Sequence, residues 1–126
     1  MCHIVLPGDT LPQGCRNPRY ATCAIGHFVR RIQALGLSPQ AFQVGLYGGG
    51  VALKSSKPKK DLIGAQNVTQ TEELLLHAGF VVSHCDVGGN YYRRLFMNLC
   101  NGQVRLEREP LRMQGQVARK DMCEEA

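Results

Sequence analysis

The sequence predicts an α/β fold, a layered sandwich in which two helices pack on a mixed β-sheet. Three observations favour it: an ordinary globular composition, two segments with helical spacing of apolar residues, and short alternating runs between them. The chain has 126 residues, of which 44% are hydrophobic and 20% charged, which suits one compact domain. The elements follow the order strand, helix, strand, helix, strand and hairpin, which is typical of a layered α/β domain.

The first half of the chain predicts a short buried strand and a long helix. Residues 4–6 are apolar and stop at Pro7, as a short strand does. Residues 18–35 have the helical spacing, and Gly36 is placed to end the helix in a left-handed conformation. The predicted apolar stripe of this helix consists of Tyr20, Ala24, Ile25, Phe28, Ile32 and Leu35.

The middle of the chain predicts two further strands with a helix between them. Residues 42–47 alternate between apolar and other residues until Gly48–Gly50 interrupts them. Residues 62–78 fit a second helix that Gly79 closes, and residues 80–85 fit the next strand.

A hairpin and a polar tail complete the pattern. Residues 94–99 and 104–106 flank Asn101-Gly102, a pair that supplies the two positive φ angles of a type I′ turn. The sequence becomes polar and charged over residues 110–126. We therefore expect one domain over residues 1–109 and a polar tail over residues 110–126, which is either mobile or a short amphipathic end.

The charge distribution argues against nucleic acid as a partner. The formal net charge is +5, but the lysines of residues 54–60 and the pairs Arg30-Arg31 and Arg93-Arg94 lie apart in the sequence. There is no Trp for base stacking. No apolar run approaches the length of a membrane span and no signal segment opens the chain, so we expect a cytoplasmic protein without membrane insertion.

The cysteines are expected to be free thiols, because a chain of this length in a reducing compartment needs no disulfides. Their spacing contains no CxxC pair, so neither a metal nor a cofactor is predicted. The six are Cys2, Cys15, Cys23, Cys85, Cys100 and Cys123.

Two glycine-rich segments invite functional interpretations that the residues alone do not favour. Gly45 and Gly50 have the separation of a phosphate-binding loop, but Val51 follows where such a loop needs lysine. A close backbone approach explains these glycines better. Asp86 precedes two glycines and could bind a cation, although an aspartate there more often caps the turn through its own backbone.

The histidines carry no signature by themselves. His27 and His77 are expected on helix surfaces, and His84 lies on a predicted strand beside Cys85, where the two side chains point to opposite faces. His3 begins an apolar strand, and general considerations favour a hydrogen-bonded structural histidine there over a general base.

Taken together, several segments resemble one family. Met1-Cys2-His3-Ile4-Val5-Leu6-Pro7 resembles the Met-x-His-x-x-Leu-Pro segment of CheD, the chemoreceptor glutamine deamidase of bacterial chemotaxis. The resemblance covers residues 1–108 in order. Its further parts are Tyr20-Ala21 with Ala24, Gly48-Gly49, Ile63-Gly64-x-x-Asn67-Val68, Asp86-x-Gly88-Gly89-Asn90-x-x-Arg93 and Gly102.

The resemblance implies a reaction and a catalytic residue. Family members hydrolyse glutamine side-chain amides of methyl-accepting chemotaxis receptors to glutamate and release ammonia. A thiolate attacks the amide carbon, and a histidine activates the thiol and protonates the leaving ammonia. His3 matches that histidine. The receptors are the implied partners, together with the CheC phosphatase.

One part of the family pattern is not found in these residues. The family's nucleophilic cysteine and an assisting threonine lie upstream of the histidine, in a Thr-Leu-Gly-x-Gly-Ser-Cys-like segment. Cys2 is not its equivalent, because it occupies the variable position between the family's Met and His. We therefore expect a CheD that is shortened at its N-terminus, and the alternative function is a catalytically inactive module that binds receptors or CheC.

Overall fold

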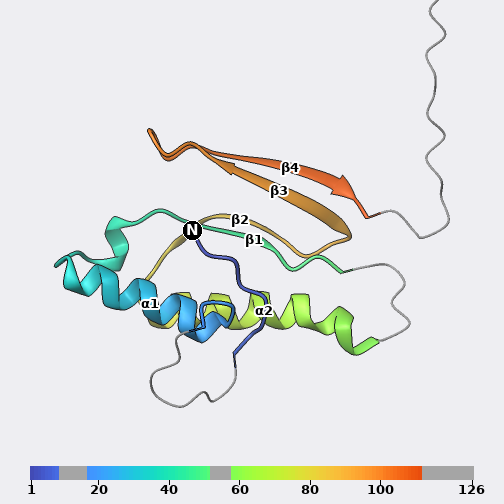
Figure 1. Cartoon of the computed structure of the whole chain (residues 1–126), viewed down its shortest axis with the longest axis horizontal. Coiled ribbons are helices and arrows are strands. Elements are labelled where there is room, and N and C mark those ends of the chain that lie inside the picture. Colours follow the sequence, from blue (N-terminus) through green and yellow to red (C-terminus); the bar gives the residue numbers. More distant parts are fainter. Residues whose placement is uncertain (9–16, 52–57, 112–126) are drawn as a thin grey trace, which may run out of the picture.

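The computed structural model describes residues 1–8, 17–51 and 58–111, and these form three layers (Figure 1). The two helices make one layer, a parallel pair of strands makes the second, and an antiparallel hairpin makes the third. The predicted α/β class with two helices is confirmed. The elements are α1 (Ala21–Ala34), a 3₁₀ turn (Pro39–Ala41), β1 (Val44–Gly48), α2 (Pro58–His77), β2 (Val82–Val87), β3 (Tyr91–Met97) and β4 (Val104–Pro110).

The helix α1 ends as the sequence predicts but begins later. Gly36 has a φ of +68°, and the N–H of Leu37 donates to the Ile32 carbonyl at 3.1 Å, which closes the last turn. The start moves to Ala21 because the N–H of Tyr20 bonds back to the Asn17 carbonyl in a turn.

The hydrophobic core lies between the helices and one face of the β1–β2 pair. Ile25 and Ile32 of α1 meet Leu75 of α2 and Phe80, each at most 7% exposed. Leu35 was predicted in the same stripe and this was wrong, because it is the C-cap of α1 and is 59% exposed. The half-buried side chains around the core are Phe28, Val29, Val44, Leu74, Ala78 and Val82.

The β1–β2 pair is parallel, and α2 is the crossover between its strands. Val44 pairs with Val82, and both pack on the core. The register shifts between Val44 and Gly45, so that further along the pair Tyr47 lies opposite Asp86. The Asp86 side chain contacts Arg93 and Arg108 and therefore faces the hairpin. Both strands begin two residues later than predicted. The predicted second helix is confirmed as α2, with an earlier start.

The N-terminal strand predicted over residues 4–6 is wrong. Only Leu6 pairs, in one isolated parallel bridge with Tyr20. Pro7 has no N–H with which to continue the ladder, which explains why the pairing stops there.

The predicted hairpin is confirmed and is longer than expected. β3 and β4 pair antiparallel from Tyr91 opposite Pro110 to Met97 opposite Val104. The predicted type I′ turn is wrong, because it needs a positive φ at both Asn101 and Gly102. Gly102 has a φ of +73°, but the φ of Asn101 is not positive, since in the described ranges only glycines have positive φ angles. The expected tail over residues 110–126 falls almost entirely outside the described residues.

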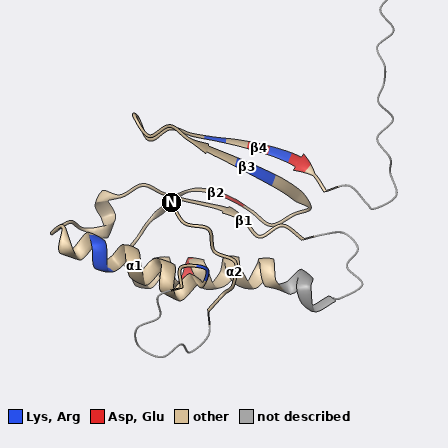
Figure 2. Cartoon of the chain, in the orientation of Figure 1, with Lys and Arg blue, Asp and Glu red and all other residues tan. Residues whose placement is uncertain are grey.

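Charged residues of the described part are divided between the layers (Figure 2). Arginines lie on α1 and, separately, on the hairpin, so the described residues form no continuous basic stripe. No helix of the described part is long and apolar enough to cross a membrane. Cys23 is disulfide-bonded, so the expectation of free thiols is wrong for this residue, whereas Cys2, Cys85 and Cys100 are free. The disulfide of Cys23 could not be predicted, because the cysteine count and spacing do not show which sulfur atoms lie close together in the fold.

Candidate active site

His3 is exposed and lies in the described N-terminal segment, residues 1–8, which is called the His3 segment below and is hydrogen-bonded to the start of α1. The N–H groups of Val5 and Leu6 both donate to the Arg19 carbonyl, at 2.8 and 3.0 Å, and the N–H of Ala21 donates to the Leu6 carbonyl at 3.0 Å. These bonds fix the segment two residues after His3 and leave the imidazole open to solvent.

Asn67 of α2 holds the same segment from a second side. Its Nδ2 donates to the Val5 carbonyl at 3.0 Å, across 62 positions of sequence. Its Oδ1 is buried and has no hydrogen-bond partner among the described residues. Asn67 and Val5 both belong to the quoted family segments, but their contact was not predicted, because spacing gives no sign of a bond over this separation.

Gly49 and Gly50, which follow β1, allow the backbone to approach neighbouring elements closely. The sequence predicted this role in preference to a phosphate-binding loop. Gly49 has a φ of +66°, and a Cβ built on it would clash with the Val68 side chain and lie 3.0 Å from the Gly64 carbonyl oxygen. A Cβ on Gly50 would lie 2.8 Å from the carbonyl oxygen of Tyr91. This turn therefore packs on α2 through Gly49 and on the hairpin through Gly50.

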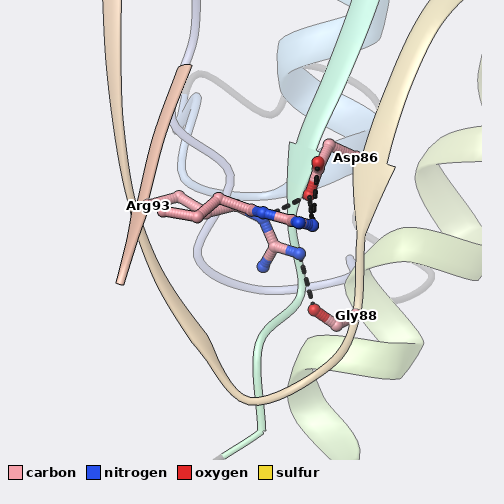
Figure 3. Close-up of polar contacts among 4 residues, drawn as sticks. Asp86, Gly88 and Arg93 are labelled. Carbon is pink, nitrogen blue, oxygen red and sulfur yellow. Dashed lines mark hydrogen bonds and ion pairs between the residues drawn. The ribbon is translucent and has the colours of Figure 1, made fainter. Parts of the chain in front are cut away.

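Asp86 binds arginines in place of a cation or its own backbone. The Nε of Arg93 donates to Asp86 Oδ1 at 2.9 Å, and Arg93 Nη2 donates to the Gly88 carbonyl at 2.6 Å (Figure 3). Arg108 Nη1 lies 3.2 Å from Asp86 Oδ2. The hydrogen bond from Arg93 is the main reason that the pKa of Asp86 lies below its ordinary value. The expected turn cap is therefore wrong.

The turn after β2 is bonded to the end of β1 and to the base of the hairpin. The N–H of Gly88 donates to the Gly48 carbonyl at 2.8 Å, and the N–H of Val51 donates to the Gly89 carbonyl at 2.9 Å. The N–H of Leu111 donates to the Asn90 carbonyl at 2.8 Å. The segment from Asp86 to Arg93 thus joins the second and third layers. Arg108 completes this cluster from β4, and no sequence signal pointed to it.

Within the described residues, none of the three free thiols has a hydrogen bond to His3. Burial is the largest influence on the Cys2 thiol and raises its pKa, although the residue as a whole is exposed and the nearby N-terminal ammonium acts in the opposite direction. Cys85 lies on β2 and Cys100 at the hairpin tip. Within the described ranges no three His, Cys, Asp or Glu residues gather as a metal site.

An open groove of about 430 Å³ lies between Pro7 of the His3 segment and α2. Pro7 forms one wall, and exposed or half-exposed residues of α2 form the other. Those residues are Ala65, Gln66, Thr69, Gln70 and Glu73.

Comparison with known proteins matches the sequence to one family. The family model described as CheD chemotactic sensory transduction matches residues 5–108. A probable chemoreceptor glutamine deamidase, CheD 2, of Geobacter sulfurreducens is 31% identical over 110 residues, which cover 86% of this chain and 65% of the relative. A probable CheD of Maridesulfovibrio salexigens is 29% identical, with coverage of 86% and 68%. A probable CheD of Pseudomonas fluorescens is 28% identical, with coverage of 98% and 71%. The chain thus spans about two thirds of the length of these curated relatives.

Proposed function

The chain belongs to the CheD family, and from this premise we propose that it takes part in deamidating glutamines of chemotaxis receptors. The observation that carries the proposal is the family match over residues 5–108 together with relatives that are named as chemoreceptor glutamine deamidases. We assign the function to residues 1–109 and place it in the cytoplasm, where the signalling parts of receptors are found.

In this proposal His3 is the general base and acid of the reaction. It takes the proton of a thiol, whose sulfur then attacks the glutamine amide carbon. The tetrahedral oxyanion is stabilised by backbone N–H donors, and His3 returns the proton to the leaving ammonia. Water then cleaves the thioester, so that amide and water become carboxylate and ammonium. The exposed position of His3 leaves it accessible to a large protein substrate.

We infer that the thiol comes from polypeptide outside the 126 residues. Within them, no segment has the family's Thr-Leu-Gly-x-Gly-Ser-Cys-like pattern. Cys2 is a poor substitute because it occupies the variable position between the family's Met and His, and burial raises the pKa of its thiol. The coding sequence before the Met1 codon tests this: an in-frame Gly-Ser-Cys segment supports it, and a stop codon directly upstream contradicts it.

Ammonia release from a glutamine-bearing chemotaxis receptor tests the activity. We expect release by a chain that includes the upstream thiol segment, with mass spectrometry locating glutamate in place of glutamine. We expect none from the 126 residues alone. Release by the 126 residues that disappears in Cys2→Ala would refute an external thiol.

The alternative function is a module that binds receptors or the CheC phosphatase without catalysis. The 126 residues contain no Thr-Leu-Gly-x-Gly-Ser-Cys-like segment, which favours this alternative for them by themselves. The groove beside the His3 segment is the candidate contact surface, since small Ala65 and Thr69 leave room there. Thr69→Arg would fill the groove, and we expect it to lower receptor binding, whereas Arg94→Ala on the distant hairpin serves as the control. Binding without ammonia release from the longer chain would favour this alternative.

A further inference from the structure

The segment that carries His3 has little regular structure of its own. Within the part of the chain that the structure describes, its one isolated bridge and its backbone hydrogen bonds go to residues 19–21 at the start of α1. A segment held along a single side can pivot about that side. The position of a catalytic histidine must be fixed more closely, because displacement of a catalytic group by about 1 Å can lower the reaction rate on the order of 100-fold.

Asn67 supplies a second attachment, from a different direction. The 3.0 Å bond from its Nδ2 to the Val5 carbonyl joins the segment to α2, two residues from His3. We propose that Asn67 is a positioning residue, which fixes the His3 segment relative to α2. The link from this role to catalysis rests on the proposed function of His3.

The surroundings of Asn67 make it a rigid support. One helical turn before it, Gly64 packs against the Gly49 backbone, and the next residue, Val68, also meets Gly49. The turn that contains Gly49 is bonded to Gly88 through the Gly48 carbonyl. Asn67 is therefore held to the β1–β2 layer, and its amide relates the His3 segment to that layer.

Neither packing nor helix propensity explains an asparagine at this position. Asparagine is a weaker helix former than most residues, and it stands in the middle of α2. Its Oδ1 is buried without a partner among the described residues, which is unfavourable. Among the described residues, the hydrogen bond that offsets these costs is the one from Asn67 to the Val5 carbonyl.

Amide hydrogen exchange of the whole chain, measured by NMR, tests the proposal. In Asn67→Ala we expect the protection of the Val5 and Leu6 amides to fall about three- to tenfold, the effect of one net hydrogen bond. The ring proton resonances of His3 should move with it. The Phe80 amide, which bonds the Leu75 carbonyl in the core, should keep its protection and so report that the fold is intact.

Asn67→Asp adds a readout that loss of packing would not give. An ionised carboxylate cannot donate to the Val5 carbonyl, whereas a protonated carboxyl group can. We therefore expect Asn67→Asp to lose protection at Val5 and Leu6 at neutral pH and regain it as the carboxylate is protonated. Gln66→Glu is the matched control, since it introduces the same charge one residue earlier at an exposed position, and should show neither change.

Two results would overturn the positioning role. One is unchanged protection at Val5 and Leu6 in both Asn67 variants, and the other is an equal fall at Phe80, which would mean general destabilisation. None of these readouts uses deamidation. If His3 proves dispensable for ammonia release while the exchange results hold, the proposed function fails and the attachment by Asn67 stands.

Discussion

Arg93 on β3 reaches Asp86 on β2, with its Nε 2.9 Å from Oδ1, and this ion pair joins the hairpin to the parallel strands. The Arg93 side chain is only 8% exposed. Its Nη2 also bonds the Gly88 carbonyl, so one guanidinium holds both the strand and the turn that follows it. The Asp-x-Gly-Gly-Asn-x-x-Arg segment is thereby explained as a structural connection between layers.

Arg93→Ala should destabilise the fold by about 1–3 kcal/mol, because the Gly88 carbonyl loses its charged donor. Arg93→Lys should recover only part of this, since lysine lacks the planar fork that serves two acceptors. Arg94→Ala, at the exposed neighbouring position, should change stability by less than about 0.5 kcal/mol. Urea unfolding measures all three. Equal midpoints for Arg93→Ala and Arg94→Ala would contradict the connection.

The pH dependence of stability should contain a contribution from Asp86. The Arg93 hydrogen bond holds the folded-state pKa of Asp86 below the unfolded value, which is about 3.9. The stabilisation is therefore present above about pH 4 and is lost as the pH falls through the lower folded pKa. Asp86→Asn should be less stable at neutral pH and should lose less stability on acidification. Parallel curves for the two proteins between neutral and acid pH would contradict this.

Gly50→Ala should be destabilising because the new Cβ would lie 2.8 Å from the Tyr91 carbonyl oxygen. We expect a cost of about 1–3 kcal/mol, as for other cases of overpacking. Gly26→Ala is the control with the opposite sign: Gly26 lies within α1, with only the end of the Arg30 side chain nearby. Alanine there should stabilise by about 0.5–1 kcal/mol. Thermal unfolding compares the two, and a stabilising Gly50→Ala would refute the close approach.

The hairpin tip should limit solubility. Leu99 is 89% exposed, and Met97 and Val104 are each 43% exposed beside it. Exposed apolar residues gathered at one site favour association between molecules. Leu99→Gln should raise the soluble concentration while it changes stability by less than about 0.5 kcal/mol. Light scattering that shows the same association before and after the substitution would contradict this.

Local patterns predicted most of the elements. Helical spacing located α1 and α2, and Gly36 and Gly79 marked their ends, because positive φ angles there are a local requirement. The predicted strands began two residues too early, because Phe42 and Phe80 are apolar residues that precede the strands and take no part in strand pairing. Phe80 enters the core before β2 begins, and Phe42 ends the 3₁₀ turn.

The site was less predictable because its contacts are distant in sequence. Family resemblance selected His3, Asn67 and Arg93, but not the bond from Asn67 to Val5. Arg108 was missed entirely, since 22 residues separate it from Asp86 and only the antiparallel register brings it opposite Arg93. The strand expected at residues 4–6 failed because one paired residue before a proline does not make a ladder.

The most direct measurement is glutamine-to-glutamate conversion on a chemotaxis receptor by a chain that includes the thiol segment, compared between His3→Ala and His84→Ala. His84 is an exposed histidine on β2 and is the matched control. His3→Ala should lower the rate by about 10²- to 10⁴-fold, the usual contribution of a general acid and base, and His84→Ala should leave it unchanged. A His3→Ala rate close to that of the unsubstituted protein would contradict the catalytic assignment.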